Sequence, residues 1–192
     1  DLGATSGRSV IGTLQDGKIE IRELTRFPNG ITTVNGKCYW NLLGLFESIK
    51  QGLTACAREG IKPHSVGIDT WGVDVVPVGK DGSILGMPRA YRDPYTDGAP
   101  ERYFEIVPRE EVYSATGIQI MNFNSVFQLD TLRRNECSAL DAADKILFIP
   151  DALAYLLTGE AVTEYTIAST AQMINPRTKQ WDEDILLLLG LN

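Results

Sequence analysis

The sequence contains little histidine, little cysteine and few positive charges. Its 192 residues include 1 His, 3 Cys, and 18 Lys and Arg against 25 Asp and Glu, which gives a formal net charge of −7. A metal site built on two histidines is therefore excluded within these residues. The single histidine, His64, follows Pro63 just before an apolar run, where we expect a residue at the surface or at a strand edge.

The acidic residues are spread along the chain, and no stripe of Lys and Arg interrupts them. Proteins that bind a phosphate backbone draw their affinity from clustered basic residues, so nucleic acid is not an expected partner. Cys38, Cys56 and Cys137 lie far apart, without a CxxC or Cys/His pattern. Their spacing favours neither a disulfide framework nor a zinc site, and it is typical of a protein from the reducing cytoplasm.

Long apolar runs are also missing. No run approaches the roughly 18 residues that a membrane-spanning helix needs, so a membrane is not an expected partner. Hydrophobic residues make up 43% of the sequence and charged residues 22%, which is ordinary for a globular protein with a buried core. The sequence has no internal repeat, low-complexity tract or linker, and we expect one compact domain.

The first residues predict an antiparallel β-ribbon. Residues 8–14 and 18–27 suit two strands joined by a tight turn at Asp16-Gly17. Alternation in the second strand predicts three inward-facing side chains, Ile19, Ile21 and Phe27. The next segment, 28–38, contains two Asn-Gly pairs and a proline, and this composition predicts a loop.

The remaining sequence alternates between helical and strand patterns. Apolar residues at helical spacing predict a helix over 42–57, stopped by Gly60. The apolar runs 65–69 and 73–79 predict two strands, so that the sheet gains a parallel central strand. Further helices are expected at 101–106, 109–116, 125–135, 150–158 and in the apolar stretch that begins near Asp182, with a buried strand at 145–149. The chain is therefore expected to be an α/β protein.

The stretch DLGATSGR, Asp1 to Arg8, has the composition of a phosphate-binding turn. Gly3 and Gly7 permit positive φ and close backbone approach, so that successive N–H groups and the hydroxyls of Thr5 and Ser6 can face an anion. Asp1 stands where it can hold Mg²⁺ through water. The stretch matches neither of the two common nucleotide fingerprints, and a plain hairpin turn is the alternative interpretation.

A second stretch, GIDTWGVDVV, places carboxylates beside an aromatic residue. Asp69 and Asp74 flank the pair Trp71-Gly72, and aromatic rings beside carboxylates are typical of sugar sites. A core tryptophan with solvated aspartates is the alternative. The stretch AYRDPYTDG, which contains Tyr91, fits a binding loop or a surface turn held by an Arg–Asp pair.

These stretches, in this order, resemble the N-terminal domain of the FGGY sugar kinases. DLGATSGR is similar to the family's phosphate hairpin, and GIDTWGVD is similar to a run found in the members that act on L-rhamnulose. The resemblance continues through AYRD with TDG, TGIQ, PDALAYLLTG and EYTIASTAQMINPRT, and so extends over essentially the whole chain.

The resemblance implies a fold and a reaction. The fold is the ribonuclease-H-like mixed sheet with flanking helices of the actin and hexokinase superfamily, in which two domains close on ATP and sugar. The reaction is ATP-dependent phosphorylation of L-rhamnulose at its 1-hydroxyl, with Mg²⁺. Residues 1–192 would be an incomplete N-terminal domain, and the C-terminal ATP-binding domain and the catalytic aspartate would lie downstream.

The resemblance also implies roles for particular residues. Ala4, Thr5, Ser6, Gly7 and Arg8 would contact ATP, together with Gly3 of the same turn, and Asp1 would lie near the metal. Gly72 would meet the sugar through its backbone, and the sugar-lining positions are Val73, Tyr91 and Phe123. To these the chemistry of the residues adds Trp71 and Asp74.

Two positions depart from the family pattern. The family usually has a basic residue where this chain has Tyr95, and often proline where it has Asn122. The sugar could therefore be another ketose or polyol, such as L-fuculose, L-xylulose or glycerol. Two further alternatives are a metal-dependent nuclease that uses Asp1 and Asp69, and a sugar-binding module without catalysis.

Overall fold

Residues 1–191 are described by the structure, a computed structural model. In chain order the elements are β1 (Ser6–Gln15), β2 (Lys18–Pro28), β3 (Ile31–Val34), β4 (Lys37–Trp40), α1 (Leu42–Arg58), β5 (Val75–Val78), η1 (Pro94–Thr96), α2 (Ala99–Phe104), α3 (Arg109–Thr116), α4 (Ser125–Arg134), α5 (Ser138–Asp141), β6 (Lys145–Phe148), α6 (Ile149–Thr158), α7 (Tyr165–Ala168), η2 (Ser169–Ala171), β7 (Ile174–Asn175), β8 (Gln180–Trp181) and α8 (Glu183–Leu189).

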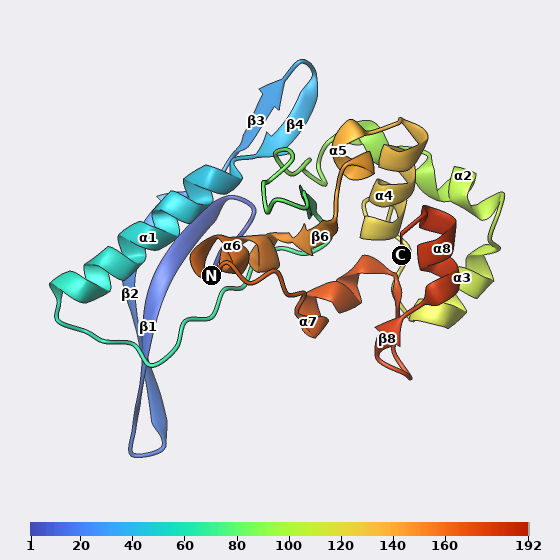
Figure 1. Cartoon of the computed structure of the whole chain (residues 1–192). Helices are drawn as coiled ribbons and strands as arrows, with labels where there is room; N and C mark the ends of the chain where they lie inside the picture. Colours follow the sequence, from blue (N-terminus) through green and yellow to red (C-terminus); the bar gives the residue numbers. More distant parts are fainter. Residues whose placement is uncertain (192) are drawn as a thin grey trace.

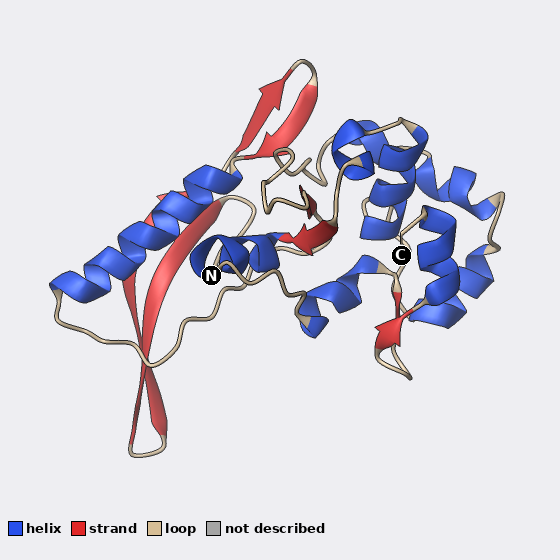
Figure 2. Cartoon of the chain, in the orientation of Figure 1, coloured by secondary structure: helices blue, strands red, loops and turns tan. Residues whose placement is uncertain are grey.

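The elements form two groups on either side of a short central ribbon. The hairpin β1–β2 with α1 and α6 makes one group, and α2, α3, α4 and α8 make the other, with β5 and β6 between them (Figure 1). Helices predominate in the second group, and the long strands belong to the first (Figure 2). The α/β class is confirmed. The strands named above form four two-stranded antiparallel sheets.

The two faces of the β5–β6 ribbon pack into different hydrophobic cores, so the ribbon connects the two cores. Val75 and Phe148, which are register partners, belong to the core around α2, α4 and α8. Val76 and its partner Leu147 belong to the core around α1 and α6. Successive side chains of a strand point to opposite faces, so four residues per strand are enough to join the two cores.

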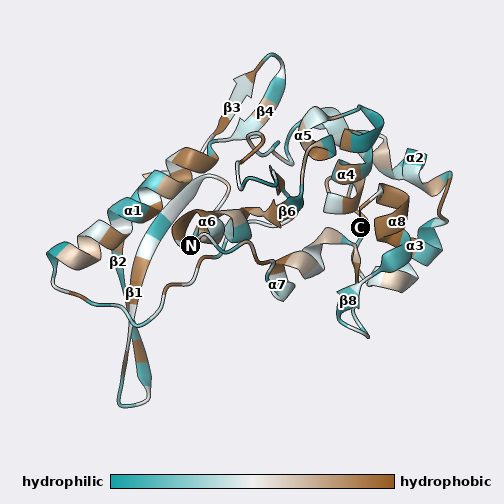
Figure 3. Cartoon of the chain, viewed as in Figure 1, coloured by the Kyte–Doolittle hydropathy of each residue, from teal (hydrophilic) through white to brown (hydrophobic). Residues whose placement is uncertain are grey.

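The hairpin β1–β2 forms as predicted, with Gln15 opposite Lys18 and positive φ at Asp16 and Gly17. The prediction that Ile19 and Ile21 face inward is wrong, since 70% and 72% of their surfaces are exposed. The turn end of the hairpin extends away from α1 (Figure 1), and apolar residues remain on this uncovered part (Figure 3). Phe27, at the other end of β2, packs against the core around α1.

The prediction of a loop over 28–38 is wrong from Ile31 onward. β3 and β4 form a hairpin there, with Val34 opposite Lys37 and the turn at Asn35-Gly36. Both turn residues have positive φ, at 51° and 73°, which is the conformation that Asn-Gly favours in a two-residue hairpin turn. The Asn-Gly pair therefore marked a hairpin turn and not the middle of a longer loop.

Helix α1 is confirmed at both ends. The Asn41 side chain accepts a hydrogen bond from the Gly44 N–H at 2.9 Å and caps the N-terminus, while Gly60 follows the C-terminus with φ of 72°. The helix packs on the hairpin through a close contact at Gly52. A Cβ on Gly52 would lie 2.0 Å from Ser9 Oγ, so only glycine fits this contact.

The strand predicted over 65–69 does not form, and the parallel central strand is reduced to a single bridge. Leu2 pairs parallel with Thr70, and the Leu2 N–H donates to the Asp69 carbonyl at 2.9 Å. Upstream of this point, residues 61–69 and β1 line a cavity of about 880 Å³ with α1. Without a neighbour at hydrogen-bonding distance, the segment cannot build a ladder.

The later elements agree more closely with the sequence patterns. The helices expected at 101–106, 109–116, 125–135 and 150–158 correspond to α2, α3, α4 and α6, and the expected strand is β6. Helix α8 turns Ile185 and Leu189 into the core, and most of it is coloured apolar in Figure 3. Within residues 1–191 no helix is long and apolar enough to cross a membrane.

The contact at Gly52 gives a test of the packing of α1. We expect Gly52→Ala to lower the free energy of unfolding by about 1–3 kcal/mol, because the overlap with Ser9 outweighs the helix propensity that alanine adds. The measurement is urea denaturation of the protein. Gly12→Ala is the matched control, since a Cβ there meets nothing within 4 Å; an equal effect of both changes would contradict this account.

Candidate functional site

The turn from Asp1 to Arg8 is held by hydrogen bonds that occupy its carbonyl groups. The Gly3 N–H donates to the Ser6 carbonyl at 2.9 Å, which closes the turn. Asn29 then bonds two of its carbonyls: the side-chain Nδ2 donates to the Gly3 carbonyl at 2.9 Å and the backbone N–H donates to the Thr5 carbonyl at 3.0 Å. Among the described residues, the N–H groups of Ala4 and Thr5 donate to no backbone carbonyl, which leaves them for an anion.

The glycines of this turn serve close packing, and neither Gly3 nor Gly7 uses the positive φ that glycine permits. Neither belongs to the residues with positive φ. A Cβ on Gly7 would lie 2.3 Å from the ring of Phe27, and one on Gly3 would lie 3.3 Å from the Ser6 carbonyl oxygen. The close backbone approach expected of both positions is present, but the left-handed conformation is not.

The charged residues of the turn are paired with each other. Arg8 Nε donates to Asp1 Oδ2 at 2.6 Å, and the two side chains keep 45% and 37% of their surfaces exposed. Within residues 1–191 no group of three or more His, Cys, Asp and Glu side chains is placed to hold a metal. The residues therefore suit a phosphate group, for which they supply backbone donors and a guanidinium, and they offer Mg²⁺ a single carboxylate.

The segment after Asp69 contains a strained turn. The Asp74 N–H donates to the Gly72 carbonyl at 2.9 Å, and Val73 between them has φ of 70°. These are the features of a γ-turn with positive φ, which is rare and costly for a β-branched residue. Such strain is typical of binding sites, where surrounding contacts hold a conformation that the chain would not adopt alone.

The carboxylate of Asp74 anchors this turn. Asp74 is fully buried, whereas 80% of the Asp69 side chain is exposed, so the alternative of solvated aspartates holds for Asp69 and not for Asp74. Its Oδ2 accepts from the indole N–H groups of Trp40 at 2.5 Å and Trp71 at 2.9 Å, and from the Tyr91 N–H at 3.2 Å. Its Oδ1 accepts from Gln128 Nε2 at 2.9 Å. Four donors from separate parts of the chain thus converge on one side chain.

Burial raises the pKa of Asp74 to about 6, from an ordinary value of 3.8. Desolvation is the largest cause, and the hydrogen bonds from Gln128, Trp40, Trp71 and Tyr91 oppose it by stabilising the charged form.

Aromatic rings surround the turn. The ring centroids of Trp40 and Trp71 are 4.3 Å apart, those of Trp40 and Tyr91 are 6.1 Å apart, and those of Tyr91 and Phe123 are 5.5 Å apart. Trp71, Tyr91 and Phe123 are half-buried, so one part of each ring reaches solvent. The four predicted sugar positions Trp71, Val73, Tyr91 and Phe123 therefore lie in one neighbourhood, around Asp74.

Glycine is required at position 72 by the packing of the turn. A Cβ on Gly72 would lie 2.8 Å from Oγ1 and 3.3 Å from Cβ of Thr170, whose hydroxyl is tied to the Ile167 carbonyl at 2.8 Å. The backbone of Gly72 therefore lies close to Thr170, and position 72 has no side chain of its own.

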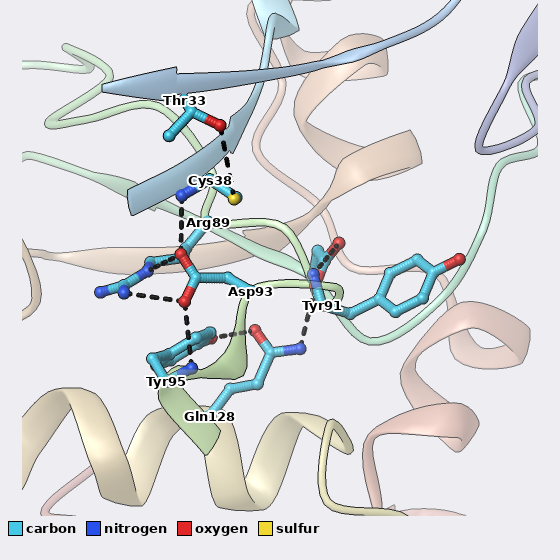
Figure 4. A network of polar contacts seen from close by, with 8 residues as sticks. Thr33, Cys38, Arg89, Tyr91, Asp93, Tyr95 and Gln128 are labelled. Carbon is cyan, nitrogen blue, oxygen red and sulfur yellow. Dashed lines mark hydrogen bonds and ion pairs between the residues drawn. The ribbon is translucent and has the colours of Figure 1, made fainter. Parts of the chain in front are cut away.

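The loop after Tyr91 is held by an Arg–Asp pair, as one of the two interpretations expected, and the pair is formed by Arg89 and the buried Asp93. Asp93 is buried and binds Arg89 twice, from Nε and from Nη2, each at 2.9 Å. It also accepts from the N–H groups of Cys38 at 2.6 Å and Tyr95 at 3.0 Å (Figure 4). These hydrogen bonds and the Arg89 charge lower the pKa of Asp93, although burial alone would raise it.

The phenol of Tyr95 points toward Gln128 and donates to its Oε1 at 2.6 Å (Figure 4). The Arg89 guanidinium lies over the Tyr95 ring, 4.3 Å from its centroid. Burial, and after it the negative charge of Asp74, raises the pKa of Tyr95, so the hydroxyl stays protonated.

The structure brings the two parts of the site to one place. The bridge between Leu2 and Thr70 joins the start of the Asp1–Arg8 turn, the candidate phosphate turn, to the residue next to Trp71. Sequence reasoning missed four residues that hold these parts: Asn29, Trp40, Gln128 and Ser125, whose Oγ donates to the Val73 carbonyl at 2.6 Å. Only Asn29 carried a signal, its place in an Asn-Gly pair. The others lie far from the motifs in sequence and meet them through folding.

Solved structures share this fold. A xylulose kinase from Lactobacillus acidophilus superimposes with a TM-score of 0.85 and 18% identity, over 100% of this chain and 39% of that one. A glycerol kinase from Plasmodium falciparum, solved with ADP, gives a TM-score of 0.73 and 15% identity over 99% of this chain and 42% of its own. The fold is that of sugar kinases, which confirms the actin and hexokinase type of α/β fold.

Sequence comparison gives the family. The model described as the FGGY family of carbohydrate kinases, N-terminal domain, matches residues 1–192. A rhamnulokinase of Bacteroides thetaiotaomicron is 56% identical over 191 residues, and one of Halalkalibacterium halodurans is 43% identical over 192 residues. The chain is covered completely in both cases and spans 39% and 41% of those proteins. The chain belongs to the FGGY family of carbohydrate kinases.

The raised pKa of Asp74 predicts a pH dependence of stability. The folded protein binds the Asp74 proton more tightly than the unfolded chain, so this group's contribution to the free energy of unfolding falls as pH rises from about 4 to about 6. We expect wild type to lose up to about 3 kcal/mol relative to Asp74→Asn between pH 4 and pH 7.

Denaturant unfolding at several pH values measures this difference. The control is Asp69→Asn, because 80% of the Asp69 side chain is exposed. Parallel stability curves for wild type and Asp74→Asn would show that Asp74 does not titrate in this range.

Proposed function

We propose that this chain is the N-terminal domain of an ATP-dependent sugar kinase that phosphorylates L-rhamnulose at its 1-hydroxyl, in the use of L-rhamnose in the cytoplasm. The observation that carries the proposal is the meeting of a phosphate turn and a strained, aromatic-lined turn at the Leu2–Thr70 bridge. Phosphoryl transfer requires the phosphate and the sugar side by side, and the rhamnulokinases reported above support the choice of sugar.

The phosphate turn would hold the terminal phosphates of ATP. The free N–H groups of Ala4 and Thr5, the hydroxyls of Thr5 and Ser6, and the Arg8 guanidinium supply donors for phosphate oxygens. Asp1, now paired with Arg8, would turn to a water of Mg²⁺ when the phosphate takes its place on the guanidinium. Mg²⁺ bound with ATP would supply positive charge against the phosphate oxygens.

The turn at Gly72 would hold the sugar. The carbonyl groups of Gly72 and Val73 accept bonds from within the protein, whereas their N–H groups donate to no carbonyl among the described residues, so they suit sugar hydroxyls. The half-buried rings of Trp71, Tyr91 and Phe123 would pack against the apolar face of the sugar.

A catalytic base for the 1-hydroxyl would come from the C-terminal domain, as would the adenine site. The relatives are more than twice as long as this chain, which leaves room for such a domain. The nuclease alternative is not favoured, because the relatives are kinases and Asp1 is paired with Arg8. A binding module without catalysis has no support from a specific feature of the site.

Assays with the full-length protein test the proposal. We expect ATP consumption with L-rhamnulose, weaker turnover with L-fuculose, L-xylulose and glycerol, and negligible turnover by residues 1–192 alone. A full-length protein that prefers another substrate would overturn the choice of sugar. Comparable rates for the fragment would overturn the assignment of the catalytic base to the downstream domain.

Asn29 gives a test that separates the ATP site from the sugar site. Asn29→Ala removes the bond to the Gly3 carbonyl, loosens the phosphate turn, and should raise the KM for ATP by about 5–10-fold while the KM for L-rhamnulose stays the same. Steady-state kinetics of the full-length enzyme measure both. In the control, Asn175→Ala, a bond to the Arg177 N–H is lost in the turn between β7 and β8, and neither KM should change.

A further inference from the structure

The amide of Gln128 lies at the centre of the sugar neighbourhood and touches three of its parts. Its Nε2 donates to Asp74 Oδ1 at 2.9 Å and to the Phe123 carbonyl at 2.8 Å, with the Val73 carbonyl at 3.4 Å. Its Oε1 accepts from the Tyr95 hydroxyl at 2.6 Å. The side chain is 1% exposed and therefore cannot bind the sugar itself.

The chemistry of these partners determines the orientation of the amide. The Asp74 carboxylate and the Phe123 carbonyl only accept hydrogen bonds, so Nε2 must face them, and Oε1 then meets the Tyr95 hydroxyl. A glutamate at position 128 would place a carboxylate oxygen, which only accepts hydrogen bonds, against the Asp74 carboxylate and the Phe123 carbonyl. An apolar side chain there would leave Asp74 Oδ1 without its donor.

These contacts hold the Gly72–Asp74 turn in its conformation. The γ-turn at Val73 is strained and needs outside support, which Ser125 Oγ supplies at the Val73 carbonyl and Gln128 supplies through Asp74. Gln128 also ties the backbone carbonyl of Phe123 to the same point. One buried side chain near the start of α4 thereby connects the Gly72–Asp74 turn to the backbone of Phe123.

We propose that Gln128 is a positioning residue for the sugar, which holds the Gly72–Asp74 turn and Phe123 in the relative placement that selects and orients the substrate. The proposal rests on the proposed function for the identity of the substrate. Tyr95 belongs to the same arrangement, because its hydroxyl donates to Oε1 of Gln128 and so holds the oxygen end of the amide.

The first test is Gln128→Met in the full-length kinase, since methionine is unbranched and of similar length. The KM for L-rhamnulose should rise about tenfold or more, whereas the KM for ATP should change less than about twofold. Thr116→Val is the matched control: it removes a buried hydroxyl bonded to the Val112 carbonyl at 2.8 Å in α3, and should lower stability without changing either KM.

A second variant covers the case in which Gln128→Met does not fold. Tyr95→Phe keeps the ring beside Arg89 and removes only the bond to Gln128 Oε1, so it should raise the KM for L-rhamnulose about two- to threefold and leave that for ATP unchanged. Unchanged sugar KM values in these variants, or equal increases for both substrates, would overturn the proposal.

A spectroscopic measurement separates this proposal from the substrate assignment. The indole N–H groups of Trp40 and Trp71 both donate to Asp74, while Trp181 is 38% exposed on β8. In NMR spectra of the full-length protein, Gln128→Met or Tyr95→Phe should shift the first two resonances and leave the third in place. Should wild type phosphorylate no ketose, the proposed function fails, and unshifted indole resonances would then reject the positioning role independently.

Discussion

The buried carboxylate of Asp74 is the group on which the candidate sugar site depends. It takes hydrogen bonds from Trp40 at the end of β4, Trp71 before the γ-turn, Tyr91 in the following loop and Gln128 in α4. Removing a carboxylate from water is costly unless donors replace the solvent, so the four segments must remain together for Asp74 to stay charged. This requirement explains how short loops keep a defined arrangement beside a turn that is itself strained.

The same requirement connects the site to the fold. The γ-turn at Gly72–Asp74 leads directly into β5, and the β5–β6 ribbon presents one face to each of the two cores. The phosphate turn is attached to the beginning of this segment by the Leu2–Thr70 bridge and is shaped from the other side by Asn29. Both candidate sites therefore belong to the junction between the cores, where a change in the packing of either core can reach them.

Local patterns predicted much of the fold because their causes are local. The hairpin at Asp16-Gly17 and the stop of α1 at Gly60 depend on residues within a few positions. The failures have non-local causes. Ile19 and Ile21 alternate as a buried strand should, yet no element covers that end of the hairpin, and residues 65–69 lack a neighbouring strand.

The sequence by itself determined the family, the two motifs of the site and the residue types that suit phosphate and sugar. Only the tertiary structure decided that Gly7 is required by the Phe27 ring, that Asp74 is buried, and that Asn29 and Gln128 hold the two turns. The reason is physical: a motif specifies donors, acceptors and backbone freedom within a short segment. Desolvation and hydrogen bonds between distant segments exist only once the chain has folded.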